Sequence, residues 1–171
     1  MTDHNSGISV LDNYFLKPGY IFVPEIPHII STVVGSSVAV SLFDRKRRLG
    51  GMGLFHFPLI KEKNKATALY GNVATLTLIA MMVGQGSRHR DLEAQIFGGA
   101  FSREISETDI GGENIDIARW VLTKKNIAII SEDVGGEKGR KIIFNTSTNE
   151  IAVLKVDALR AVDWYPYENN R

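Results

Sequence analysis

Residues 35–58, with the sequence GSSVAVSLFDRKRRLGGMGLFHFP, carry the clearest fold signal in this chain of 171 residues. Residues 38–43 form an almost continuous apolar run, which is typical of a strand buried on both faces. Residues 44–48 are charged and predict a solvated turn, and residues 50–58 predict a second strand that opens on glycines. Another β-branched run, at 28–34, precedes the glycine–serine break. Together these segments predict a meander of three antiparallel strands.

Two helices are expected farther along the chain. Residues 72–84 and 113–125 have apolar side chains at helical spacing, and glycines at 84 and 86 would end the first helix. Asn126 is suited to cap the second helix, whose acidic start and basic end match the helix dipole. The residues spaced along one face are Val73, Leu76, Ala80 and Val83 in the first helix, and Ile117, Trp120, Val121 and Lys124 in the second, with Trp120 expected in the core.

Shorter apolar runs complete the pattern. A strand is expected at 92–97, a buried strand at 127–130, and a hairpin made of 140–145 and 150–156. Strands mixed with two main helices predict the α/β class. The expected architecture is a layered domain in which mixed β-sheets are flanked by these two helices.

Composition and charge exclude several classes of protein. Twenty basic against nineteen acidic side chains give a formal charge of +1, without the basic excess of a nucleic-acid-binding domain. The chain has no cysteine, so disulfides and thiolate metal sites are excluded. Residues 1–7 are polar, unlike a secretory signal, and the apolar stretch at 73–83 is too short to cross a bilayer. We expect a cytoplasmic protein without membrane insertion, with one domain at 12–160 between tails at 1–11 and 161–171.

Several short blocks, in a fixed order, carry a resemblance to a known family. The blocks are KPG at 17–19, ST at 31–32, GSSVAVSLFD at 35–44, GGM at 50–52 followed by Pro58, LEAQIFGGA at 92–100, IGGEN at 110–114 and SEDVGGEKGR at 131–140. In these blocks the chain resembles the CheD-type chemoreceptor glutamine deamidases. The resemblance implies a fold like that of deamidating bacterial toxins. It also implies conversion of glutamine to glutamate on methyl-accepting chemotaxis receptors, and binding to CheC-type phosphatases.

The catalytic positions implied by this resemblance are altered here. The family pattern implies a Cys–His pair with a hydroxyl residue that orients the imidazole. In this chain the cysteine position is Ser37, the histidine position is Leu54, and the hydroxyl residue falls at Ser31. Ser41 stands where many relatives have a second cysteine. A serine attacks only when a base removes its proton, and Leu54 cannot do this.

His56 is the nearest candidate for a substitute base. In a regular strand it points to the same face as Leu54 but lies about 6.6 Å farther along, more than twice a hydrogen-bond length. A bulge at Gly53 could shift the register and rescue a Ser37–His56 pair; otherwise His56 is a satisfied histidine at the end of a buried strand. The sequence therefore favours a protein that binds receptor or phosphatase and has lost hydrolysis. The alternative is an active, serine-dependent deamidase that uses Ser37 and His56.

Neither a cofactor nor a metal site is expected. His4, His28 and His89 lack the spacing of metal ligands and are expected at the surface or in loops. The segment 84–88 could be taken for a phosphate loop, but helix termination explains it better. No lysine or helix start supports a phosphate cradle at 35–37. The aromatic residues around Trp164 could form an exposed patch or pack against the domain.

Overall fold

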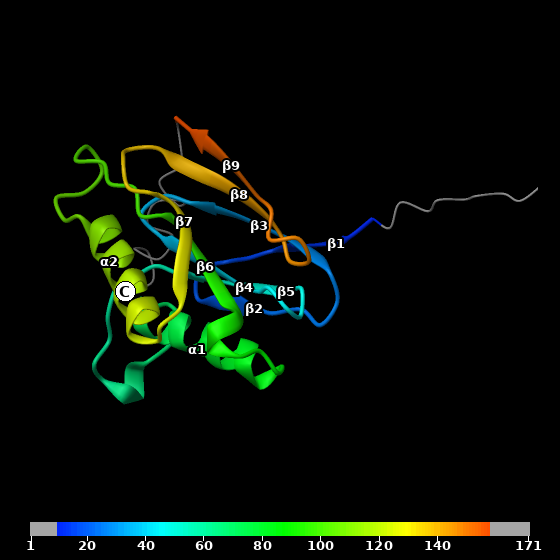
Figure 1. Ribbon diagram of the computed structural model, residues 1–171. Coiled ribbons are helices and arrows are strands. Elements are labelled where there is room, and N and C mark those ends of the chain that lie inside the picture. Colours follow the sequence, from blue (N-terminus) through cyan, green and yellow to red (C-terminus); the bar gives the residue numbers. More distant parts are fainter. Residues whose placement is uncertain (1–9, 158–171) are drawn as a thin grey trace, which may run out of the picture.

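The computed structural model describes residues 10–157, whose strands form two sheets (Figure 1). The four-stranded sheet has the order β1-β3-β8-β9, and the five-stranded sheet has the order β2-β5-β4-β6-β7. Each sheet contains one parallel pair, β1 with β3 and β6 with β7, so both are mixed. The strands are β1 (Asp12–Phe15), β2 (Tyr20–Phe22), β3 (His28–Val34), β4 (Val38–Asp44), β5 (Leu49–Phe55), β6 (Leu92–Gly98), β7 (Ala128–Val134), β8 (Gly139–Asn145) and β9 (Ile151–Val156); the helices are α1 (Gly71–Gly84) and α2 (Ile110–Lys124), with 3-10 turns at Lys63–Lys65 and His89–Asp91.

The elements stack in three layers. Figure 1 shows β3, β8 and β9 on one side of the five-stranded sheet and the two helices on the other. One apolar cluster fills the space between this sheet and the helices, and a second lies between the two sheets. The predicted class is confirmed: a layered α/β arrangement with mixed sheets and two main helices.

Strand β4 lies at the centre of the five-stranded sheet, and all seven of its residues are buried. Val40 and Leu42 belong to the cluster under the helices, whereas Ala39 belongs to the cluster between the sheets. The strand is therefore covered on both faces, which explains its nearly continuous apolar sequence. Residues two apart share a face, so Ser37, Ala39 and Ser41 all point toward the other sheet.

The predicted three-stranded meander is wrong, because β3 belongs to the four-stranded sheet. β3 pairs with β1 and β8, and only β4 and β5 form a hairpin. The segment between β3 and β4 crosses from one sheet to the other. Its carbonyl groups are satisfied by distant partners: Ala100 N donates to Gly35 O and Gly99 N to Ser37 O, each at 2.8 Å. A glycine–serine break has the same local pattern whether it turns a hairpin or carries the chain between sheets.

Both helices form, but their buried faces differ from the predicted ones. In α1 the exposed residues include Leu76 and Val83, two of the four apolar residues that the sequence placed at helical spacing along one face. Apolar side chains surround this helix, so their spacing does not select one face. The helix ends as predicted, with Gly86 in the left-handed region at φ 103°. The buried residues of α1 are Gly71, Ala74, Thr75, Leu78, Ile79 and Met82.

Helix α2 begins three residues earlier than predicted. The carboxylate of Asp109 accepts a hydrogen bond of 2.8 Å from Gly112 N and so caps the helix. The prediction that Trp120 is a core residue is wrong, because its side chain is 55% exposed. At the other end Asn126 adopts φ 54°, the left-handed conformation expected of a helix-ending residue.

The remaining strands lie close to the positions that the sequence predicted. The hairpin of β8 and β9 is confirmed, with Phe144 opposite Ile151. The segment predicted as a buried strand at 127–130 became β7, which lies at a sheet edge and exposes 49% of Ile130. Within residues 10–157 no helix has both the length and the apolar character needed to cross a membrane. The predictions for His4, for Trp164 and for most of the two tails fall outside the described residues.

Candidate active site

Ser37 and His56 lie opposite each other at one end of the β4–β5 hairpin. The ladder runs without a shift from the pair Asp44–Leu49 to the pair Val38–Phe55, so Ser37 and His56 stand one step beyond it. The Ser37 Oγ atom lies 2.8 Å from the His56 Nδ1 atom, and each residue is only 2% exposed. The expectation that no proton acceptor reaches Ser37 is therefore wrong. The sequence argument measured position along one strand, whereas cross-strand pairing places residue 56 opposite residue 37 without a bulge.

Burial sets the protonation state of His56. It lowers the pKa of the imidazole to about 4, because the interior disfavours the charged form. The ring is therefore neutral at physiological pH. In the tautomer with hydrogen on Nε2, its Nδ1 atom can accept the Ser37 hydroxyl proton. The geometry suits a nucleophile and its base, although a base with so low a pKa has little driving force for proton transfer near pH 7.

Asn114 on α2 joins the two segments that carry this pair. Its Nδ2 atom donates to Ser36 O at 3.0 Å and to His56 O at 2.9 Å, and the residue is fully buried. The sequence analysis placed Asn114 in a family block without giving it a role. Charged residues, Glu113 and Asp116, lie close to it in the sequence, so no local pattern marked Asn114 as a buried amide.

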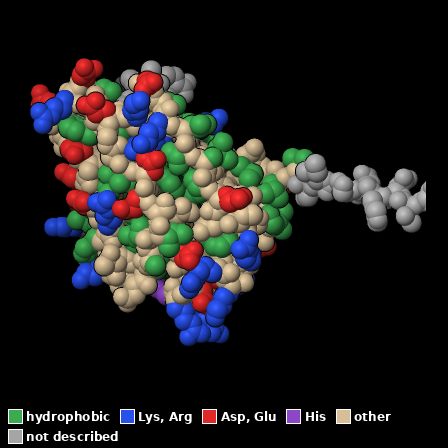
Figure 2. Space-filling view, turned by 45° about the horizontal axis from the view of Figure 1, so that its top comes forward, with side chains coloured by type: hydrophobic (Ala, Val, Ile, Leu, Met, Phe, Trp, Pro, Cys, Tyr) green, Lys and Arg blue, Asp and Glu red, His purple; other side chains and the backbone are tan. Residues whose placement is uncertain are grey.

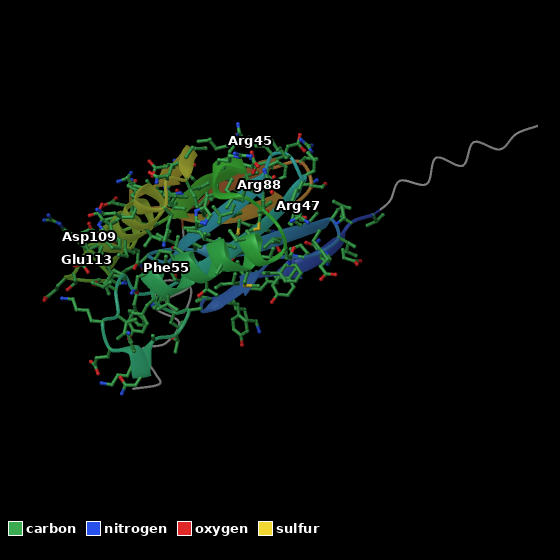
Figure 3. The ribbon with its side chains drawn as sticks, turned by 60° about the horizontal axis from the view of Figure 1, so that its bottom comes forward. Arg45, Arg47, Phe55, Arg88, Asp109 and Glu113 are labelled. Carbon is green, nitrogen blue, oxygen red and sulfur yellow. The ribbon has the colours of Figure 1, made fainter. Side chains whose placement is uncertain are left out.

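A groove with a volume of about 440 Å³ lies between the start of α2 and two loops, and neither Ser37 nor His56 lines it. Gly99, on its edge, is the residue whose N–H group donates to Ser37 O. Asp109 and Glu113, labelled in Figure 3 near Phe55, mark the start of α2, and Asp109 also lines the groove. The groove is therefore connected to the segment that carries Ser37 through the backbone of Gly99, and the Ser37 side chain itself stays buried.

Comparison with known proteins identifies the family of this scaffold. A family model described as CheD chemotactic sensory transduction matches residues 58–155. A probable chemoreceptor glutamine deamidase CheD from Sulfurimonas denitrificans is 35% identical over 140 residues, which cover 80% of this chain and 90% of that protein. Proteins of the same name from Trichlorobacter lovleyi and Methanococcus vannielii are 39% identical over 145 residues and 32% identical over 150 residues. These matches cover 84% and 86% of this chain and 90% and 97% of the relatives. The chain belongs to the CheD family.

Leu54, which the family resemblance predicts at the histidine position, is an apolar core residue. Leu54 is fully buried in the cluster between the sheets, opposite Ala39 of β4 and Tyr20 of β2. No proton transfer can pass through Leu54, so any base chemistry in this CheD scaffold depends on another residue.

The structure does not bring Ser31, which the family resemblance predicts as the orienting hydroxyl residue, to the pair. Ser31 alternates with the buried residues Ile30 and Thr32 in β3, so its side chain lies on the face directed away from the other sheet. Its neighbour Thr32 is the buried hydroxyl, and it donates to Leu16 O at 2.8 Å. The role of Ser31 as an orienting residue remains a prediction without a contact to support it.

The other candidates lie apart from the pair. His28 Nδ1 lies 2.8 Å from Ile26 O, and His89 Nδ1 lies 3.4 Å from Lys125 O. No cluster of three His, Asp or Glu side chains suited to a metal ion occurs among residues 10–157. Ser41 is buried on the same face as Ser37, and its Oγ atom has no hydrogen-bond partner among the described residues. Ser37 is therefore distinguished from Ser41 by a hydrogen bond to an imidazole.

Proposed function

We propose that this CheD-family protein is a chemoreceptor glutamine deamidase that uses Ser37 as nucleophile and His56 as base. One observation carries the proposal: the Ser37 Oγ and His56 Nδ1 atoms are 2.8 Å apart, within the reach that a general base needs. The names of the relatives supply the substrate class, glutamine side chains of chemoreceptors.

The reaction then follows the logic of a serine acyl transfer. Ser37 Oγ attacks the carboxamide carbon of the glutamine while its proton moves to His56 Nδ1. The C–N bond breaks, and His56 returns the proton to the leaving ammonia, which leaves an acyl ester on Ser37. Water, deprotonated by His56, attacks this ester. The products are glutamate on the receptor and a free Ser37 hydroxyl.

The environment of His56 makes slow turnover the expected behaviour. The intermediate requires a positively charged imidazolium, and burial disfavours that charge, as the pKa of about 4 indicates. A catalytic base works best when its pKa is close to the working pH. A serine hydroxyl also ionises less readily than a cysteine thiol. We therefore expect the Ser37–His56 pair to hydrolyse glutamine slowly.

Ammonia release from a cognate receptor fragment tests the proposal. The wild-type protein is expected to release ammonia and to convert a receptor glutamine to glutamate, as detected by mass spectrometry. Ser37→Ala and His56→Gln should abolish both signals, because the first removes the nucleophile and the second keeps a polar side chain without a usable base. Ser41→Ala is the matched control, since it removes a buried hydroxyl from the same face of β4. Ammonia release that persists at the wild-type rate in Ser37→Ala would exclude this mechanism.

A second candidate function is receptor or CheC-type phosphatase binding without turnover. The observation that favours it is Leu54, which places a fully buried aliphatic side chain at the CheD-family histidine position. In this case the wild-type protein and Ser37→Ala would bind the receptor fragment equally, and neither would release ammonia. A burst of ammonia matching the enzyme concentration would separate slow turnover from this alternative.

A further inference from the structure

We infer that Asn114 is a positioning residue, whose side-chain amide sets the separation between the backbone segments that carry Ser37 and His56. For its catalytic meaning this inference rests on the proposed function. The structural part of the inference does not, because it concerns how the pair is held together.

The contacts of Asn114 leave one orientation for its amide. Both neighbours of the side chain are backbone carbonyl oxygens, Ser36 O and His56 O, which can only accept hydrogen bonds. The amide nitrogen must therefore face them, and it uses one proton for each. The Oδ1 atom is buried without a partner among the described residues. The two bonds donated by the nitrogen therefore offset part of the cost of burying the unpaired oxygen.

The bridge lies where the strand ladder stops. The last paired residues are Val38 and Phe55, and beyond them the backbone bonds diverge. Ser37 O accepts from Gly99 N on the β6 side, whereas His56 N donates to Leu69 O in the loop before α1. The ladder alone therefore does not fix the separation of residues 37 and 56. A single planar NH₂ group that binds the carbonyls of residues 36 and 56 does fix it, because its two N–H bonds have a rigid angle.

A second asparagine provides a matched control. Asn72 lies near the start of α1, and its amide also binds backbone groups: Oδ1 accepts from Ile60 N at 3.1 Å, and Nδ2 donates to Ile60 O at 2.9 Å. This clamp holds a loop that follows β5 and does not touch Ser37 or His56. Asn72→Asp therefore loses a comparable donor without a direct effect on the pair.

The test compares Asn114→Asp and Asn114→Ala with Asn72→Asp. NMR titration of the His56 ring and ammonia release across pH are measured for each variant. Losing the bridge lets the segments separate and admits water, so the pKa of His56 should rise from about 4 toward its ordinary value near 6.5. Ammonia release should fall by about 100-fold, as expected for a displaced catalytic pair. Asn114→Ala shows the effect without a new charge, and Asn72→Asp should leave both readouts unchanged.

Asn114 variants that keep the His56 titration and the rate of the wild-type protein would overturn the inference. If these variants do not fold, a measurement on the wild-type protein still tests whether the bridge exists. Scalar couplings across hydrogen bonds should connect Asn114 Nδ2 to the carbonyl carbons of Ser36 and His56. Side-chain amide protons that exchange as fast as those of an exposed asparagine would refute the bridge. Absence of ammonia release from the wild-type protein would refute the proposed function alone, because the titration and the couplings test the bridge independently.

Discussion

The two ends of the β4–β5 hairpin bury polar residues in opposite electrostatic states. At the turn, Asp44 is 1% exposed, and its Oδ1 atom accepts hydrogen bonds from Lys46 N at 2.9 Å and Arg47 N at 3.0 Å. Figure 3 labels Arg45, Arg47 and Arg88 at this end, and lysine and arginine side chains gather along the lower edge of the face in Figure 2. At the other end, His56 is equally buried but faces the neutral hydroxyl of Ser37.

The pKa values of the two residues show what this difference means. Burial acts to raise the pKa of Asp44, but the backbone hydrogen bond from Arg47, the side chain of Ser87, the backbone hydrogen bond from Lys46 and the charge of Arg47 together outweigh it, so the pKa is lowered and the carboxylate stays charged. For His56 burial lowers the pKa to about 4, and the ring stays neutral. Burial opposes charge at both ends, and directed N–H donors reverse its effect only at the turn.

The largest expected effect is a loss of stability in mild acid caused by His56. The pKa of this histidine is near 6.5 in the unfolded chain and about 4 in the folded protein. Above pH 6.5 both states are neutral at this site. As the pH falls from 6.5 to 4, the unfolded state binds a proton first, so the free energy of unfolding should decrease by about 3 kcal/mol. Urea denaturation at several pH values measures this change, and His56→Gln should remove it. An equal slope in both proteins would mean that His56 is not held neutral.

At the turn end, Asp44→Ala should destabilise the protein by about 2 kcal/mol, because two backbone N–H groups lose a charged acceptor. Asp44→Asn keeps an acceptor oxygen and should cost less. The pH window also differs from that of His56. A lowered carboxyl pKa gives stability that is present above the unfolded value near 3.9 and is lost as the pH falls through the folded value. Denaturation of Asp44→Asn should therefore show a weaker pH dependence than the wild-type protein below about pH 4 and keep the dependence between 4 and 6.5.

Local sequence patterns predicted where the strands and helices lie better than which strands pair and which helix faces are buried. Strand β4 and the β8–β9 hairpin depend on apolar runs and turn residues, which lie close together in the sequence. The meander failed because the carbonyls of Gly35 and Ser37 find their donors at residues 99 and 100, more than sixty positions away. The buried face of α1 was missed because apolar residues surround the helix.

The same limit applies to the candidate site: local patterns predicted a residue, but not its contacts with residues far away in the sequence. The position of Ser37 followed from the family resemblance, since a nucleophile segment is a local pattern. The proximity of His56 did not follow, because it depends on the register of β4 against β5, which the sequence argument did not use. The role of Asn114 depends on the packing of α2 against two strand ends, and no local pattern encodes that contact.

A thiol at each of two serine positions should sharpen the contrast within the site. The natural chain has no cysteine, so alkylation by iodoacetamide reports only on the introduced thiol. Ser37→Cys and Ser41→Cys both place it in a buried position on the same face, but only residue 37 contacts an imidazole. The neutral His56 ring accepts a hydrogen bond from the protonated thiol and so disfavours the thiolate, and Ser37→Cys should therefore react about tenfold more slowly than Ser41→Cys at pH 7. A faster reaction of Ser37→Cys, measured by mass spectrometry, would show that the imidazole takes the thiol proton and is charged.

The smallest expected effect is a change in the free energy of unfolding that has opposite signs when each of the two serines is replaced by alanine. Ser41 buries a hydroxyl without a partner among the described residues, so Ser41→Ala removes an unpaired polar group and should raise the free energy of unfolding by about 1 kcal/mol. Ser37→Ala removes a hydrogen bond to His56 and should lower it by about 1 kcal/mol. Both changes delete a single oxygen from one face of the hairpin, so differences in cavity size contribute little. Urea denaturation of the two variants at pH 7 therefore isolates the hydrogen bond. If Ser41→Ala proved the more destabilising change, the hydroxyl at residue 41 would have to be bonded, and the distinction between the two serines would fail.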